Sequence, residues 1–258
     1  MSIFQALILG LVQGLTEFIP VSSSGHLLIV HEIFGTSENT LSFDVALHVG
    51  TLLALIIFFR KDILSLAKNI LSKNKQGRLA RLLILATVPA AVVGLLFSDF
   101  IDENLRSPVV VAVTLAAVGV IMLIADKLSK NNSDNKEVST KQGLIVGFTQ
   151  ALALIPGVSR SGATMTAGLF AGLGRVQAAR FSFLLAIPII AGSALGIFIK
   201  DGDVASTGGA QLAIGMVAAF ISGMFAIKFL LDVIGKVGLK PFAYYRFFAA
   251  VLVLIFLV

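Results

Sequence analysis

Long apolar runs separated by short polar segments make up almost the whole chain. A helix that crosses a bilayer needs about 20 apolar residues, and six runs approach or reach this length. They are residues 43–59, 79–97, 107–125, 179–199, 211–231 and 241–258. The pattern predicts an all-α polytopic membrane protein in which these six runs are transmembrane helices.

Two further apolar regions, residues 3–34 and 142–173, are each interrupted near the middle by a polar stretch. The interruptions read IPVSSSG and IPGVSRSG. Each half of these regions has roughly 10–14 residues, a length typical of re-entrant segments. A loop at membrane depth is tolerated only where protein buries it or where it lines a wet cavity. We therefore expect two re-entrant helical hairpins with polar tips.

The two broken regions align at a constant offset of 137 residues, as from Gly10 to Gly147. Identical pairs at this offset include Gln13 with Gln150, Ser22 with Ser159, Ser24 with Ser161, and Gly25 with Gly162. Each half then holds one hairpin and three transmembrane helices, and an odd number of crossings inverts the second copy. We expect an inverted repeat of halves 1–126 and 142–258, joined by a polar linker at 127–141 into a single membrane domain.

Composition supports a membrane protein and excludes some chemistry. Hydrophobic residues make up 57% of the chain and charged residues only 13%, against about a quarter charged in soluble domains. The chain has no cysteine, which excludes disulfides, thiol catalysis and thiolate metal ligands. The net charge of +6 fits basic cytoplasmic loops. We therefore expect the lipid bilayer, and no nucleic acid, as a partner, while a homo-oligomer stays open.

The charges of the loops predict an orientation. Basic residues are concentrated in loops 60–78, 127–141 and 236–240, which the positive-inside rule places in the cytoplasm. Loops 99–106 and 201–203 lack a basic excess and are expected outside. With six crossings, both termini then lie outside, the first hairpin inserts from outside and the second inserts from inside.

The two tips differ at three aligned positions that carry chemistry. The pairs are Glu17 with Leu154, Ser23 with Arg160, and His26 with Ala163. One tip thus supplies a carboxylate, a hydroxyl and an imidazole, and the other a guanidinium. Because ionisable groups inside a membrane are costly and usually functional, we expect a catalytic site. The alternative is a simple ion pair between Glu17 and Arg160.

The tips also favour an anionic ligand. The half-helices begin near Gly25 and Gly162, so their N-termini, which attract anions, point at the tips. Arg160 adds a bidentate donor suited to phosphate. The candidate phosphate ligands are Ser22, Ser24, Gly25, Ser159, Ser161, Gly162 and Thr164. A serine that bonds only to its own helix backbone would need no ligand, and this alternative stays open.

Gln13 and Glu17 are four residues apart and share one helix face. Their oxygens could hold Mg²⁺, which takes one or two carboxylates together with phosphate oxygens. The tips contain neither a Walker A sequence nor a G-x-S-x-G elbow.

Other polar residues within the apolar runs are expected to support the site or the membrane interface. Asp44 and His48 in the first half, and Arg180 and Ser182 in the second, are interpreted as supporting or inter-repeat contacts. Near the inner end of the last run, Tyr244, Tyr245 and Arg246 are interpreted as interfacial anchors.

Two sequence stretches, QGLTEFIPVSSSGHL and IPGVSRSGATMT, resemble the two signatures of the bacterial undecaprenyl-diphosphate phosphatase family, also called bacitracin resistance proteins. FDVALHVGT and ARFSFLLAIP resemble the intervening blocks, so the similarity covers nearly the whole chain. The resemblance implies an enzyme that removes the terminal phosphate of undecaprenyl diphosphate and so recycles the lipid carrier of cell-wall synthesis. It also implies a divalent cation, Mg²⁺ or Ca²⁺, and an active site that opens to the outer face of the cytoplasmic membrane.

The resemblance also assigns site residues. The E/Q-x-x-x-E pattern of the family falls on Gln13 and Glu17, its serine cluster on Ser22 and Ser23, and its histidine on His26. The P-G-x-S-R-S-x-x-T pattern covers residues 156–164. Some members carry glutamate where this chain has Gln13, so Glu17 must here carry any carboxylate role alone.

We interpret Ser23 as the nucleophile, Glu17 or His26 as its base, and Arg160 as the group that stabilises the transferred phosphoryl oxygens. Direct attack by water stays open. The competing function is a secondary transporter or flippase of an anionic prenyl lipid, because such proteins also use inverted repeats and broken helices. The concentration of distinctive groups in one tip argues against transport, and a structural scaffold leaves the buried charges unexplained.

Overall fold

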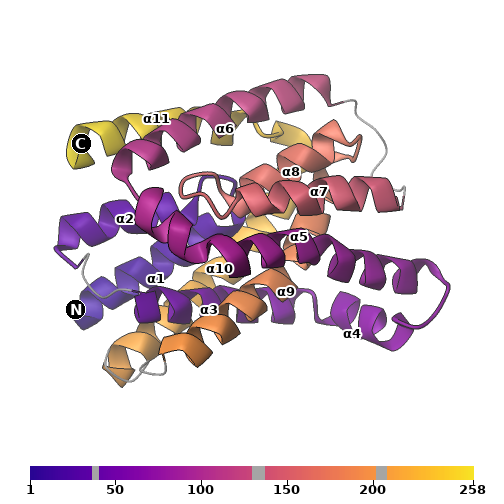
Figure 1. Cartoon of the computed structure of the whole chain (residues 1–258), viewed down its shortest axis with the longest axis horizontal. Helices are drawn as coiled ribbons and strands as arrows, with labels where there is room; N and C mark the ends of the chain where they lie inside the picture. The colour runs from indigo at the N-terminus through magenta and orange to yellow at the C-terminus, as the bar shows by residue number, and fades with distance from the viewer. Residues whose placement is uncertain (37–40, 130–136, 202–207) are drawn as a thin grey trace.

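The computed structural model describes residues 1–36, 41–129, 137–201 and 208–258, so the linker 127–141 and the loop 201–203 lie partly outside the described residues. The described ranges hold eleven α-helices and no strand, which confirms the all-α prediction (Figure 1). The helices are α1 (Ile3–Phe18), α2 (Ser23–Phe34), α3 (Leu41–Phe58), α4 (Arg60–Asn69), α5 (Lys75–Asn104), α6 (Pro108–Leu128), α7 (Thr140–Leu152), α8 (Arg160–Phe170), α9 (Arg175–Asp201), α10 (Gly209–Val237) and α11 (Lys240–Leu257).

Five helices, α5, α6, α9, α10 and α11, are long and apolar enough to cross a membrane. They confirm five of the six predicted spans. The remaining predicted span, 43–59, is occupied by α3, which meets α4 at a bend of 75°. The two helices count as a sixth span only if they are taken together. Because α4 begins with Arg60, Lys61 and Asp62, its charges disfavour the bilayer interior.

Both predicted hairpins are present as a helix, a short tip and a second helix. Helix α1 packs against α2 and α7 packs against α8, with tips at 19–22 and 153–159. The 16 residues of α1 exceed the expected half-length. The tips meet near the middle of the molecule (Figure 1), where the Ser161 hydroxyl donates to the Ile19 carbonyl at 3.2 Å. Orientation across the membrane and inversion of the second half stay predictions.

Glycines let the first helix of each hairpin lie close against a long helix. A Cβ atom on Gly10 or Gly14 would collide with the backbone of α10, at Gly215 and next to Ser222. A Cβ on Gly147 of α7 would likewise collide with the backbone of α5. Small residues that let helix backbones approach are a common packing device in membranes. These contacts fix α1 and α7, and hence the tips, within the bundle.

Candidate active site

The two tips share an unusual backbone conformation. Ser22 precedes α2 with a φ of 75°, and Ser159 precedes α8 with a φ of 71°. A non-glycine residue with positive φ is uncommon, and such strain is concentrated at functional sites. In the described chain these are the only two such residues, and they coincide at the 137-residue offset. The matched geometry supports the internal repeat at the level of the tips.

The serines common to both tips make matching contacts. The hydroxyl oxygens of Ser22 and Ser24 lie 3.2 Å apart, as do those of Ser159 and Ser161. The Ser159 hydroxyl also accepts the Gly162 N–H at 3.1 Å and so caps α8, whereas α2 has no side-chain cap. The shared serines therefore shape the turns, and the N-terminus of α2 retains N–H groups without a side-chain partner.

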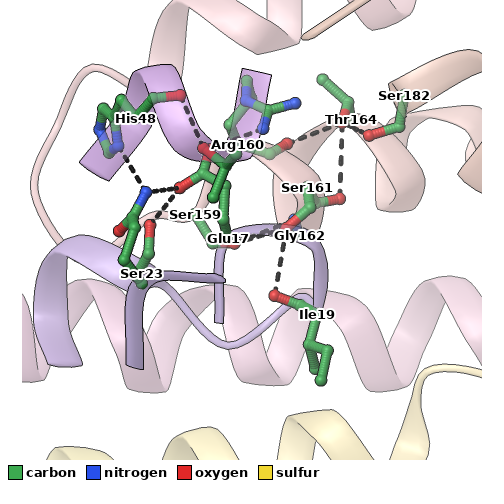
Figure 2. Close-up of polar contacts among 12 residues, drawn as sticks. Glu17, Ile19, Ser23, His48, Ser159, Arg160, Ser161, Gly162, Thr164 and Ser182 are labelled. Carbon is green, nitrogen blue, oxygen red and sulfur yellow. Dashed lines mark hydrogen bonds and ion pairs between the residues drawn. The ribbon is translucent and has the colours of Figure 1, made fainter. Parts of the chain in front are cut away.

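The Glu17 carboxylate joins the two tips (Figure 2). Its Oε2 accepts the Ser23 hydroxyl at 2.6 Å and the Gln13 amide at 3.0 Å. Its Oε1 accepts Arg160 Nη2 at 2.7 Å. Ser23 and Arg160 thus both hydrogen-bond to one carboxylate. They occupy the same aligned position of the two tips. This arrangement confirms that the tips approach each other as the repeat predicted.

The ion pair is largely removed from water, with side-chain exposures of 12% for Arg160 and 7% for Glu17. Mutual attraction and the added hydrogen bonds offset the desolvation of the two charges. Arg160 Nη1, however, is buried and has no partner among the described residues. Nearly all buried polar groups find partners, so a buried guanidinium nitrogen without one is unusual. The free nitrogen therefore argues for a ligand beyond Glu17.

A cavity of about 180 Å³ opens beside this cluster. This volume far exceeds the roughly 10–15 Å³ that one water requires. Its lining combines polar residues of the tips and of α7 with apolar side chains of α5, α9 and the second tip. The lining residues are Glu17, Ser22, Ser23, Ser24, His48, Ala90, Gln150, Ala153, Leu154, Ser159, Arg160, Ile189, Ile190 and Ser193.

Buried polar atoms without partners are concentrated here. Among the described residues, four such side-chain atoms belong to three residues at or next to the cavity: Gln13 Oε1, both amide atoms of Gln150, and Arg160 Nη1. Only Asp126 and Thr166 contribute further ones within the described ranges. A polar ligand in the cavity would satisfy groups that the protein itself leaves without partners.

His26 lies in the first tip but faces away from the carboxylate. Its Nδ1 lies 2.7 Å from the Ser22 carbonyl and its Nε2 lies 2.7 Å from the Tyr245 hydroxyl. It is not among the residues that line the cavity. Of the two expected bases, Glu17 is therefore the one in contact with the Ser23 hydroxyl.

Several other predicted ligands lie behind the cavity wall. The Thr164 hydroxyl donates to the Arg160 carbonyl at 2.7 Å and lies 2.6 Å from the Ser182 hydroxyl. Ser182 thus joins α9 to α8 just after the second tip. Gly25 and Gly162 are buried in the first turns of α2 and α8, and neither lines the cavity.

The other expected supporting residues separate into two groups. His48 lines the cavity and contacts the Gln13 amide through Nδ1, so it belongs to the site. Asp44 instead lies 3.0 Å from the buried His31 ring and joins α2 to α3. Arg180 pairs with Asp62 at 3.0 Å and does not line the cavity.

Arg246 is not an interfacial anchor, and that prediction is wrong. Its side chain is fully buried and donates to the carbonyls of Thr114, Leu115 and Gly157 at 3.2, 3.1 and 2.8 Å. Gly157 belongs to the second tip, so Arg246 ties that tip to α6. Sequence could not reveal this role, because the face that α11 turns toward the bundle is decided by packing.

The site offers few ligands for a resident metal. The described ranges contain no group of three or more His, Asp or Glu residues that could hold an ion. Gln13 Oε1 is nevertheless buried without a partner next to the Glu17 carboxylate. One carboxylate and one free amide oxygen fit a cation that arrives with phosphate oxygens as its other ligands.

Comparison with known proteins agrees with this geometry. The family model described as bacitracin resistance protein BacA matches residues 6–252. The chain belongs to the bacitracin resistance protein BacA family. Among BacA relatives, the undecaprenyl-diphosphatase of Caldicellulosiruptor bescii is 43% identical over 99% of this chain and 98% of its own length. The undecaprenyl-diphosphatase of Aliivibrio salmonicida is 46% identical over 95% of both chains.

Proposed function

We propose that this BacA-family protein hydrolyses undecaprenyl diphosphate to undecaprenyl phosphate and inorganic phosphate. The relatives that match nearly its whole length are named for this activity. The observation that carries the proposal is the contact of Glu17 with both Ser23 and Arg160, beside a cavity with unpartnered polar groups. A hydroxyl nucleophile, a base and a guanidinium that stabilises developing charge are groups that phosphoryl transfer uses.

Ser23 is the proposed nucleophile. As its oxygen bonds to the terminal phosphorus, its proton passes to Glu17 Oε2, which already accepts the hydroxyl at 2.6 Å. The bond between that phosphorus and the bridging oxygen breaks, and undecaprenyl phosphate leaves with the bridging oxygen. Water then attacks the phosphoserine, Ser23 regains a proton and inorganic phosphate is released. Direct attack by water, with Glu17 as the base, is the competing mechanism.

Arg160 and the start of α2 would stabilise the transferred phosphoryl group. Nη2 can remain on Glu17 while Nη1, which has no partner in the described chain, binds a phosphoryl oxygen. The N-terminus of α2 lacks a side-chain cap, so its N–H groups are free to bind an anion. Because Ser159 caps α8, the first tip is the better place for the phosphate.

A divalent cation would be held by the Glu17 carboxylate and the Gln13 amide oxygen. When bound, it would neutralise charge on the diphosphate. In the structure the Gln13 amide nitrogen faces Glu17 at 3.0 Å, so the amide would turn to bring its free oxygen to the ion.

The substrate lipid fits a protein with extensive apolar surfaces. Phe225, Phe248 and Ile255 on α10 and α11 are examples of large exposed hydrophobic side chains, which would face the bilayer. The family resemblance implies a cytoplasmic membrane with the site open to its outer face. The prenyl tail would then enter the bundle sideways from the bilayer.

Phosphate release by the purified protein in detergent tests the proposal. Hydrolysis requires no gradient, so the protein should release phosphate from undecaprenyl diphosphate in micelles, and a chelator should lower the rate. A protein that binds the lipid but releases no phosphate, with or without Mg²⁺ or Ca²⁺, would instead be a transporter or flippase.

A further inference from the structure

Gln150 is a buried amide that the expected chemistry leaves unused. It lies in α7, is 2% exposed and lines the cavity together with Glu17, Ser23 and Arg160. Neither its amide nitrogen nor its amide oxygen has a hydrogen-bond partner in the part of the chain that the structure describes. An amide buried without partners lowers stability by about 1–3 kcal/mol. A bound ligand would supply the hydrogen bonds that this amide lacks.

Comparison with Gln13 explains why this amide is free. The two glutamines occupy the same position of the repeat. Gln13 has Glu17 one helical turn later, and its amide donates to that carboxylate at 3.0 Å. The residue one turn after Gln150 is Leu154, which also lines the cavity. The second copy therefore has the amide donor, Gln150, but no carboxylate one turn later to accept its hydrogen bond.

We propose that the Gln150 side-chain amide is a further substrate-binding group that donates to a phosphate oxygen of the diphosphate. The inference rests on the proposed function. An ionised diphosphate presents only acceptors, which suits the N–H₂ group of Gln150 and the free Nη1 of Arg160. The Gln150 carbonyl oxygen then accepts a hydrogen bond from a water in the cavity, which has room for one.

Replacing Gln150 with methionine tests this assignment, because methionine has a similar length and no amide. A binding role predicts that KM for a short-chain prenyl diphosphate rises at least about tenfold. The inhibition constant of inorganic phosphate should rise in parallel. The melting temperature of the ligand-free protein should stay level or rise, since the change removes an unsatisfied buried amide.

Thr149→Val is the matched control. Thr149 is the neighbour of Gln150 in α7, is half-buried, does not line the cavity, and donates to the Ile145 carbonyl of its own helix. It should leave KM and the phosphate inhibition constant within about twofold of the wild type.

The outcomes separate the inference from the proposed function. Normal KM and phosphate inhibition in Gln150→Met, with an active wild type, would overturn the inference alone. A melting temperature that falls together with activity would also overturn it, because the amide would then be structural. A wild type that releases no phosphate would overturn the proposed function itself.

Discussion

Replacing Arg160 with lysine should slow the reaction without unfolding the protein. Arg160 Nη2 donates to Glu17 at 2.7 Å, while Nη1 is buried without a partner in the described ranges. Lysine keeps the positive charge but ends in a single nitrogen and lacks the planar fork of a guanidinium. It can therefore remain the counter-ion of Glu17 or bind the phosphoryl group in good geometry, but it cannot do both.

The expected loss is one charge-assisted hydrogen bond to the phosphoryl oxygens. Such bonds contribute about 1.5–3 kcal/mol. If that bond is fully formed in the transition state, its loss lowers kcat/KM by roughly 10- to 160-fold. The loss should be smaller than that caused by removing the positive charge altogether, because lysine still compensates the buried carboxylate.

Phosphate release by purified Arg160→Lys, together with its melting temperature in detergent, measures this effect. Arg180→Lys is the control, because Arg180 pairs with Asp62 at 3.0 Å and does not line the cavity. We expect the control to stay within about twofold of the wild type, as exposed ion pairs contribute little. Near-normal kcat/KM in Arg160→Lys would refute the reasoning and leave Arg160 as a structural partner of Glu17.

Three further predictions test other parts of the account. Ser23→Ala should lower turnover by at least on the order of 10³-fold with KM little changed, whereas Ser24→Ala should retain most of the wild-type turnover. If both variants stay active, water attacks the phosphorus directly. Arg246→Met should lower stability by about 1–3 kcal/mol, because the Gly157 carbonyl loses its donor; an unchanged melting temperature would contradict this. A Lys73→Cys variant should be protected from a membrane-impermeant thiol reagent in intact cells, and labelling from outside would reverse the topology.

The apolar pattern predicted much of the fold because length and composition alone decide whether a helix can cross a bilayer. Helices α5, α6, α9, α10 and α11 follow from it. It could not predict the bend of 75° after α3. There the apolar run ends at Phe59, and the charged stretch that follows continues as α4 in another direction. The direction of α4 depends on its packing against other helices.

The repeat alignment predicts from sequence that Ser23 and Arg160 lie close together, because equivalent positions of two facing tips can meet. It could not show that both contact Glu17, or that His26 turns toward Tyr245. The contacts of Glu17 depend on how the two hairpins pack together, and the contact of His26 depends on how α11 packs beside α2; local sequence encodes neither. The burial of Arg246 was missed for the same reason.

The central claim is that Glu17 accepts a proton during hydrolysis, and Glu17→Gln tests it most directly. Glutamine has nearly the same shape, and its carbonyl oxygen can still accept one hydrogen bond, but it cannot act as a base at neutral pH. Turnover of undecaprenyl diphosphate by the purified variant should fall at least about 10²-fold, the usual range for losing general-base catalysis. The protein should still fold and bind the lipid. A folded Glu17→Gln protein that releases phosphate at close to the wild-type rate would contradict the claim.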